Sequence, residues 1–276
     1  MTPKPLRARP APPPLFAFPW PAPLVEGTLL RRYHRFLTDV RLPSGELVRA
    51  HCVNTGAMEG LVRPGARVWL CPAASPGRKL PFTWVSMELP DGTLVGVDTS
   101  LPNRLVGALL EARKLPGHEK HRGYTAEVAY GEGSRVDFAV KTPRGVRLLE
   151  VKNCHLVYPD GGAYFPDSVS ERGAKHLREL AEVARGKGKA AVLFVVQRED
   201  ARFVRPSDVH DPVFSQEARA AAEAGVTFAA LRLRPTQEGV EVIGTLPVDL
   251  TPYPPEDPRR WREEGRRWSG WERPPR

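Results

Sequence analysis

Residues 134–152 read SRVDFAVKTPRGVRLLEVK, and this stretch decides the fold class of the second half of the chain. Apolar residues alternate with charged ones over Arg135–Val140 and again over Val146–Lys152. Between these two runs, Lys141–Gly145 holds proline and glycine, which favour a turn. The pattern therefore predicts a β-hairpin, and Tyr124–Tyr130 reads as a further strand before it.

Three charged side chains in this hairpin form a candidate site. Side chains alternate between the two faces of a strand, so Glu150 and Lys152 point to one face while Val151 points to the other. A tight turn would place Asp137, on the preceding strand, beside Glu150. The sequence thus predicts two carboxylates and one amine on adjacent strands.

This set of residue types suits phosphodiester chemistry that depends on a metal ion. Mg²⁺ prefers oxygen ligands and keeps several waters, so two carboxylates and substrate phosphate oxygens are a typical set of ligands. The bound ion lowers the pKa of a water molecule and neutralises charge on the phosphate, and a neighbouring lysine orients that water or pairs with phosphate. We therefore interpret Asp137, Glu150 and Lys152 as candidate catalytic residues, with Asp137 and Glu150 as ligands for Mg²⁺ or Mn²⁺.

The spacing alone is common by chance, and a Glu–Lys pair on a solvated sheet face is its ordinary explanation. Two observations favour the site. The carboxylates lie in otherwise apolar strands, where an unused charge is costly. In addition, a helix predicted from Glu171 to Arg185, between an N-cap at Ser170 and a stop at Gly186, presents basic side chains at helical spacing.

Further residues are assigned around this site by their place in the pattern. The basic side chains of this helix are expected to face phosphate. The alternative is that they form an ordinary solvent-exposed surface. Glu127 is a candidate further acid or a residue that supports the metal ligands. Asp167, in the loop before the helix, is a candidate supporting residue, metal ligand or substrate contact, and a role as a turn residue is favoured. The candidate residues for binding nucleic acid are Arg135, Arg172, Lys175 and His176.

The first half of the chain has a different pattern. Residues 25–98 contain short strand-like segments separated by turn signals such as Pro43-Ser44-Gly45 and Asp91-Gly92. This density of short strands predicts an OB-like closed barrel. The predicted strands are Gly27–Tyr33, Leu37–Leu42, Leu47–Val53, Arg67–Cys71, Phe82–Glu88 and Thr93–Val97.

Residues 99–236 form the second predicted domain, of α/β class with a mixed sheet. A helix begins near Asn103, the strand Ala190–Val196 is apolar throughout, and a helix over Gln216–Ala224 precedes the strand Val226–Leu233. Two flanking segments remain. Residues 1–24 hold nine prolines and predict a disordered leader. Residues 237–276 predict a strand and then an extension rich in Trp, Arg and Pro, which either stacks on bases or packs on the domain surface; packing is favoured because acidic residues are interspersed.

Composition limits the class of protein. The net charge of +9 favours a polyanionic partner, and residues 99–236 carry the largest excess, with 22 basic against 17 acidic side chains. No apolar run is long enough for a membrane helix, and prolines interrupt any signal-peptide core. The three cysteines are isolated, which disfavours a disulfide framework. We expect a cytoplasmic protein without a membrane partner. The composition leaves both a monomer and a homodimer as alternatives.

Many ordered stretches resemble the sugar fermentation stimulation protein A (SfsA) family. They extend from about residue 25 to residue 235 and leave out the leader and the extension. The stretches include His51–Gly56, Pro102-Asn103-Arg104-Leu105-Val106, Ser134-Arg135-Val136-Asp137-Phe138, Glu150-Val151-Lys152, Phe165-Pro166-Asp167 and Lys175-His176-Leu177. The resemblance implies an OB-like domain and a domain similar to PD-(D/E)XK nucleases, whose site maps onto Asp137, Glu150 and Lys152. It also implies non-specific DNA binding and a regulatory role in sugar (maltose) metabolism.

Three functions follow as hypotheses. The favoured one is a DNA-binding protein of this family with an intact acid–acid–lysine site. The alternative is an active nuclease that depends on Mg²⁺ or Mn²⁺. A weaker alternative is an oligosaccharide-binding barrel. The sequence does not decide between binding and cleavage, because small differences in geometry determine whether such a site turns over.

Overall fold

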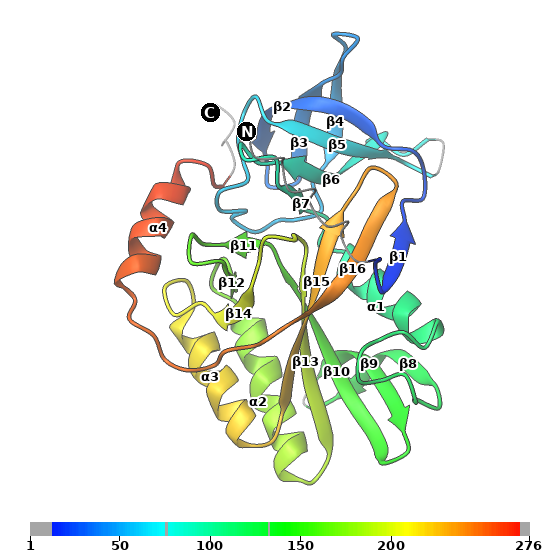
Figure 1. Ribbon diagram of the computed structural model, residues 1–276, viewed down its shortest axis with the longest axis vertical. Helices are drawn as coiled ribbons and strands as arrows, with labels where there is room; N and C mark the ends of the chain where they lie inside the picture. Colours follow the sequence, from blue (N-terminus) through cyan, green and yellow to red (C-terminus); the bar gives the residue numbers. More distant parts are fainter. Residues whose placement is uncertain (1–12, 75–76, 132, 271–276) are drawn as a thin grey trace, which may run out of the picture.

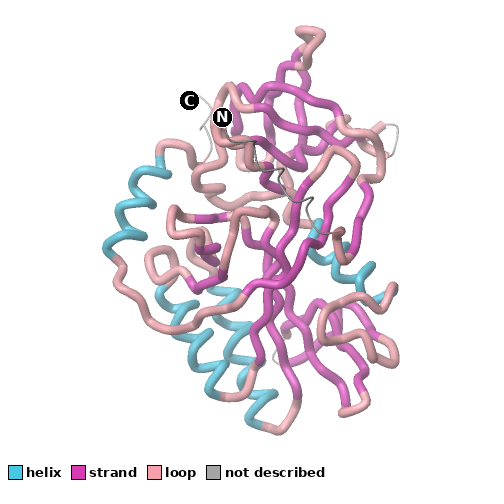
Figure 2. Tube along the Cα trace, viewed as in Figure 1, coloured by secondary structure: helices cyan, strands magenta, loops and turns pink. Residues whose placement is uncertain are grey.

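The computed structural model describes residues 13–74, 77–131 and 133–270, which form two domains joined by a broad contact (Figure 1). The N-terminal domain is an OB-like β-barrel, and the C-terminal domain is an α/β domain with a mixed sheet. Both confirm the predicted fold class. The colouring by secondary structure in Figure 2 shows helices only in and around the second domain and at the C-terminal end.

The barrel is one sheet that closes on itself. Its strand order is β4-β3-β2-β5-β6-β7, and β4 also pairs with β6, which leaves no long free edge. Alternate side chains fill the interior, among them Leu29, Val40 and Trp84, which are fully buried. Each predicted strand of this domain is present. The bounds are β2 (Val25–Tyr33), β3 (Leu37–Arg41), β4 (Leu47–His51), β5 (Arg67–Pro72), β6 (Phe82–Glu88) and β7 (Leu94–Gly96).

The second domain is built on a seven-stranded sheet in the order β1-β16-β15-β13-β10-β9-β8. The central pairs β10–β13 and β13–β15 are parallel, and the remaining pairs are antiparallel. The bounds are β1 (Phe16–Pro19), β8 (Tyr124–Tyr130), β9 (Ser134–Thr142), β10 (Gly145–Cys154), β13 (Lys189–Val196), β15 (Thr227–Pro235) and β16 (Gly239–Leu246). A small sheet of β11 (Leu156–Val157), β12 (Gly162–Phe165) and β14 (Phe203–Pro206) adjoins it.

Helices cover both faces of the large sheet, which explains the continuous apolar run of β13. Leu193 of β13 shares a core with α1 (Leu101–Glu111), whereas Phe194 shares a core with α2 (Glu171–Arg185) and α3 (Pro212–Glu223). Successive β13 side chains thus meet opposite layers. Because Leu149 and Val151 of β10 belong to the α1 layer, Glu150 and Lys152 lie on the α2 side.

The helix ends follow their capping residues. The Ser170 hydroxyl accepts a hydrogen bond from the Gly173 amide at 3.1 Å, and α2 ends at Gly186, as predicted. Helix α3 begins four residues before its predicted start, because Asp211 caps the Phe214 amide at 2.9 Å and Pro212 fits the first turn.

The disordered leader predicted for residues 1–24 is wrong for its second half. Strand β1 pairs antiparallel with β16 at the edge of the sheet. Proline is tolerated there, because the missing N–H of Pro19 removes no hydrogen bond from the interior of the sheet. Phe16 and Phe18 pack on the core, and Trp20 is buried, with its indole N–H bonded to the Thr236 carbonyl at 2.9 Å. The prediction for residues 1–12 lies outside the described residues.

The C-terminal segment packs on the molecule rather than extending from it. Strand β16 is part of the large sheet, so the predicted boundary at residue 236 falls inside that sheet. Helix α4 (Glu256–Arg266) then runs along the side where the two domains meet (Figure 1). The Trp268 carbonyl accepts from the Val62 amide at 2.8 Å, and the Trp261 ring lies 5.5 Å from the Tyr158 ring. The packing interpretation is therefore confirmed for residues up to 270.

Candidate metal and nucleic-acid site

The β9–β10 hairpin brings the predicted acid–acid–lysine set together. The ladder between the strands runs to the pair Phe138–Leu149, and Asp137 and Glu150 are the next two positions. The ladder stops there because the Asp137 carboxylate, instead of a strand carbonyl, accepts the Val151 amide at 2.6 Å. The end of the hairpin thus fixes Asp137 beside Glu150.

Asp137 is held by two donors from two elements. Its Oδ2 accepts from the Val151 amide, and its Oδ1 accepts from Nδ2 of Asn103, in the first turn of α1, at 2.7 Å. Burial, and then the like charge of Glu150, raise the pKa of Asp137 above its ordinary value. A cation beside both carboxylates would relieve this repulsion.

Glu150 is buried and its two oxygens differ. Oε1 accepts from Lys152 Nζ at 2.7 Å and from His176 Nδ1 at 2.6 Å. Burial opposes its ionisation, but the His176 hydrogen bond and the Lys152 charge outweigh it, so the pKa of Glu150 is lowered. Oε2 is buried and has no hydrogen-bond partner, which leaves one oxygen able to meet a ligand.

The contact with Arg172 determines which ring nitrogen of His176 carries the proton. The Arg172 guanidinium donates from Nε to His176 Nε2 at 3.3 Å. Because a guanidinium only donates, Nε2 is the accepting nitrogen and Nδ1 carries the proton that reaches Glu150. Arg172 therefore orients His176, and His176 in turn holds Glu150.

The residues fit a hard divalent cation. The buried, unpartnered Glu150 Oε2 and the Asp137 carboxylate are oxygen donors of the kind that Mg²⁺, Mn²⁺ or Ca²⁺ takes. Within residues 13–74, 77–131 and 133–270, no group of three or more His, Cys, Asp or Glu side chains is arranged to hold a metal ion. A cation here would be held by two carboxylates and completed by water or phosphate oxygens.

The predicted nucleic-acid-binding residues line one groove beside this site. Its volume is about 680 Å³, and β8, β9 and the first turns of α2 form its walls. Arg135 points to the same face of β9 as Asp137, since the two are separated by one residue. The lining side chains include Glu127, Arg135, Arg172, Lys175, His176 and Arg178.

The two predicted second-shell acids have different outcomes. Glu127 is exposed on the rim of the groove, at a positive φ of 54° that displaces it from the regular strand. Asp167 is not in the site: its Oδ2 accepts from the Met58 amide of the barrel at 3.0 Å and lies 3.3 Å from His155 Nε2. Despite burial, these partners lower the pKa of Asp167 to about 2. These contacts join the barrel to the second domain, so Asp167 does not support the Asp137–Glu150 site as predicted.

Two residues of the site were not predicted from the sequence as site residues. Asn103 was assigned only to the start of α1, although its amide contacts Asp137. Tyr130 contacts the His176 carbonyl through its hydroxyl at 3.5 Å, and burial together with the nearby Glu150 raises its pKa. An amide at the start of a helix that precedes the hairpin is the only sequence signal for Asn103.

Comparison with known proteins shows the family. The model described as the SfsA N-terminal OB domain matches residues 30–97, and the sugar fermentation stimulation protein RE domain matches residues 100–239. The chain belongs to the sugar fermentation stimulation protein family. Homologues of that name from Jannaschia sp. and Methylobacterium sp. are 47% and 46% identical over 239 and 235 residues, and the matches cover 84% of this chain and 98% of each relative.

A solved structure supports the same family fold. The Pyrococcus furiosus SfsA in complex with Ca²⁺ has a TM-score of 0.77 and 28% identity, and the match covers 86% of this chain and all of that one. The RE-domain match includes Asp137, Glu150 and Lys152, and both matches end before α4. Membership in the SfsA family was predicted from the ordered motifs and is confirmed.

In the described part of the chain, no helix is both long and apolar enough to span a membrane.

Proposed function

We propose that this SfsA-family protein binds DNA without sequence specificity through the groove between β8, β9 and α2. The observation that carries the proposal is the position of Arg135, Arg172 and Lys175 around a hollow that adjoins the buried carboxylates. Basic side chains of this kind bind the phosphate backbone by charge and release counterions, which gives affinity without sequence information.

The charges in the groove suit a backbone contact. Arg135 and Arg172 present guanidinium groups, which match phosphate oxygens in two-point hydrogen bonds. A duplex phosphate at this place would lie next to Asp137 and Glu150, where two carboxylates would repel it. A divalent cation between phosphate and carboxylates removes that repulsion, so binding is expected to tighten with Mg²⁺ or Ca²⁺.

Equilibrium binding of a fluorescent duplex over a salt series tests this proposal. The logarithm of the binding constant is expected to fall linearly with the logarithm of salt concentration. The Arg135→Ala/Arg172→Ala double variant is expected to lose about two units of that slope. Arg185→Ala is the matched control, because Arg185 lies at the far end of α2 and does not line the groove. A slope that is equal in wild type and the double variant would refute the assigned groove.

A second candidate function is hydrolysis of a phosphodiester bond, favoured by the acid–acid–lysine set. When bound, a divalent cation supplies a water of lowered pKa and stabilises charge on phosphate. Asp137 and Glu150 would hold that cation. The Lys152 ammonium, fixed by Glu150 at 2.7 Å, would orient the attacking water or pair with a phosphate oxygen, while His176 keeps Glu150 in place.

Cleavage is tested with Mn²⁺ or Mg²⁺ on duplex, nicked, single-stranded and branched DNA. Lys152→Met is expected to abolish cutting and to leave DNA binding within about threefold, because Lys152 is only 13% exposed and is not among the residues that line the groove. The absence of cutting by the wild type on each substrate would refute the hydrolase and leave the binding proposal intact.

The family name supports a physiological role in sugar metabolism, which we propose is exerted through DNA binding in the cytoplasm. A strain carrying the Arg135→Ala/Arg172→Ala variant is then expected to lose the growth phenotype of the intact gene on maltose. If sugars bind the barrel instead, maltose will raise the unfolding temperature of the purified protein, and the growth phenotype will survive in the variant.

A further inference from the structure

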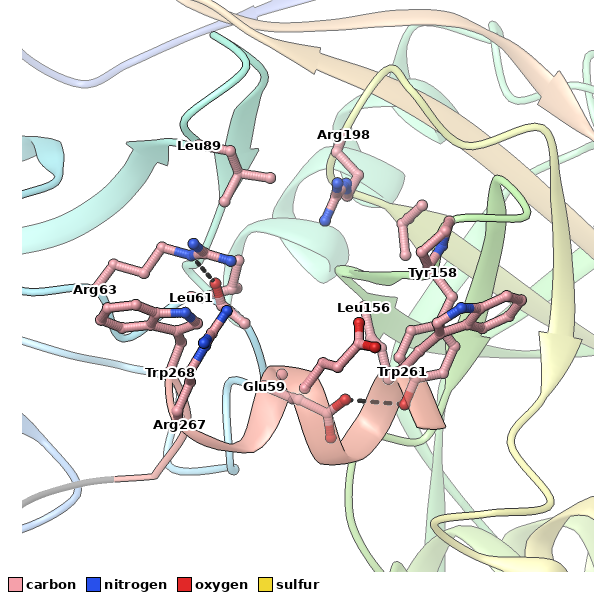
Figure 3. A pocket seen from close by; sticks show the side chains of 15 residues that line it. Glu59, Leu61, Arg63, Leu89, Leu156, Tyr158, Arg198, Trp261, Arg267 and Trp268 are labelled. Atoms are coloured by element: carbon pink, nitrogen blue, oxygen red, sulfur yellow. Dashed lines mark hydrogen bonds between the residues drawn. The ribbon is translucent and has the colours of Figure 1, made fainter. Parts of the chain in front are cut away.

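A second pocket lies far along the chain from the hairpin, where three parts of the molecule meet. Its volume is about 240 Å³, and it is lined from the barrel, from the second domain and from the segment that contains α4 (Figure 3). Trp261, Gly265 and Trp268 line it at the spacing i, i+4, i+7, so one stripe of the C-terminal segment forms its outer wall. Because the family models end at residue 239, this wall is a feature of the chain outside them.

Three guanidinium groups surround this hollow, one from each part. Figure 3 shows Arg63 of the barrel and Arg267 of the C-terminal segment on one side, beside Trp268, with Arg198 of the second domain opposite. Arg198 is paired with Asp200 at 2.6 Å. Neither Arg63 nor Arg267 forms an ion pair with any described residue, and both instead lie over the Trp268 ring at 5.2 and 5.6 Å.

Two acids, Glu59 and Glu264, also line the pocket, and the buried one is already bound by other side chains. Glu59 is 5% exposed, and its two oxygens accept from the Tyr158 hydroxyl at 2.9 Å and from His210 Nε2 at 2.8 Å. Burial, together with the charges of Arg267 and Arg198 and against that of Asp91, lowers the pKa of Arg63. The like charges of Arg63 and Arg267 thus act on each other at the pocket, and a bound anion would relieve their repulsion.

We propose that this pocket binds the phosphate group of a small phosphomonoester. A phosphomonoester carries a charge of about −1.5 to −2 at neutral pH and three terminal oxygens. These oxygens suit the donors of Arg63 that its Gly60 hydrogen bond leaves over, the Arg267 guanidinium and the remaining donors of Arg198. Glu264, also in the lining, supplies an acceptor for hydroxyl groups on the organic part. The volume excludes a nucleic-acid duplex, so this site differs from the DNA groove in both place and ligand.

The pocket depends on the close approach of α4. A Cβ atom at Gly265 would lie 3.1 Å from both Cγ and Oε1 of Glu59. Glycine is less favourable than alanine inside a helix, and here it allows the helix to contact the buried acid. A larger residue at this position would move the outer wall without removing any of the three arginines.

Calorimetric titration of the full chain tests the proposal, with inorganic phosphate, a hexose phosphate and a nucleoside monophosphate as probes and an unphosphorylated hexose as the negative probe. At least one phosphorylated probe is expected to bind. Arg63→Gln and Arg267→Gln are each expected to weaken it about tenfold or more. Gly265→Val is expected to weaken it without loss of charge. Arg266→Gln is the matched control, since Arg266 is exposed and outside the lining.

The outcomes separate this site from the DNA groove. Binding that is retained in Arg172→Ala and weakened about tenfold or more in Arg267→Gln supports the proposal, provided that Arg267→Gln unfolds at the wild-type temperature. The proposal is overturned if no phosphorylated probe binds the wild type, if Arg267→Gln binds the probe as tightly as the wild type, or if binding is lost in Arg172→Ala. Each of these results leaves the DNA-binding proposal to its own test.

Discussion

The Asp137 side chain ends the hydrogen-bond ladder between β9 and β10 and forms part of the candidate site. Its Oδ2 takes the Val151 amide that a ladder carbonyl would otherwise receive, so the hairpin opens where the site begins. The alternating pattern of β9 and β10 predicted that Asp137, Glu150 and Lys152 meet on one face. It did not predict Asn103 or the separation of Asp167, because contacts between distant segments leave no local pattern in a sequence.

The pKa of Asp137 predicts how metal binding depends on pH. Because the folded pKa of Asp137 is raised, the unfolded chain ionises this group more readily than the folded metal-free protein does. The stability of the metal-free protein therefore falls as pH rises from the ordinary pKa through the folded pKa. A cation needs the ionised form. Stabilisation by Ca²⁺ or Mn²⁺, measured as a rise in unfolding temperature, is therefore expected to grow as pH rises through the pKa of Asp137.

Two variants check this metal prediction. Asp137→Asn is expected to abolish the metal-induced rise, whereas Glu127→Gln on the exposed rim is expected to keep it. A rise of equal size at acid and neutral pH, or one retained in Asp137→Asn, would place the cation elsewhere.

Asp167 provides a stability prediction at the same scale. Its pKa of about 2 lies below the ordinary value of 3.8, so its stabilising effect is present above about pH 4 and is lost as pH falls toward 2. Asp167→Asn is expected to lower the free energy of unfolding at neutral pH by about 2 kcal/mol, measured by urea denaturation.

Asp249 is the matched control for this change. Its pKa is also about 2, chiefly through hydrogen bonds from Thr251 and Arg205, but it is more exposed than Asp167 and therefore more screened by solvent. Asp249→Asn is expected to cost less than Asp167→Asn, and the reverse order would contradict the joining role given to Asp167.

At the scale of elements, the local sequence pattern predicted the strands and helices that pack their apolar residues in a core. The apolar run of β13, the caps of α2 and the barrel strands follow from local pattern, and each is present. Strand β1 was missed because prolines hid the alternation of Phe16, Phe18 and Trp20, and because an edge strand tolerates proline. The small sheet of β11, β12 and β14 was missed because strands of two to four residues give no periodic signal.

Strand β1 is expected to contribute measurably to stability. Trp20→Ala removes a buried indole and its hydrogen bond to Thr236, and it is expected to cost about 3–5 kcal/mol in the free energy of unfolding. Leu15→Ala, at a side chain that is 51% exposed, is the control and is expected to stay within about 0.5 kcal/mol. Equal small effects would mean that β1 is detached in solution.

At the scale of the whole molecule, the two domains form one unit held by buried polar contacts. Glu59 of the barrel loop bonds His210 and Tyr158 of the second domain, and Met58 bonds Asp167. Helix α4 then covers this junction. The sequence predicted both domains but not their arrangement, because the residues that join them are single positions in loops.

The central claim is that DNA lies in the groove between β9 and α2, over Asp137 and Glu150. Hydrogen-exchange mass spectrometry of the full chain with and without a short duplex tests this location most directly. The expected result is slower exchange at Ser134–Asp137 and at the first-turn amides of α2, with little change in the barrel. Protection confined to the barrel strands Leu37–Arg41 and Leu47–His51, with the groove unchanged, would contradict it.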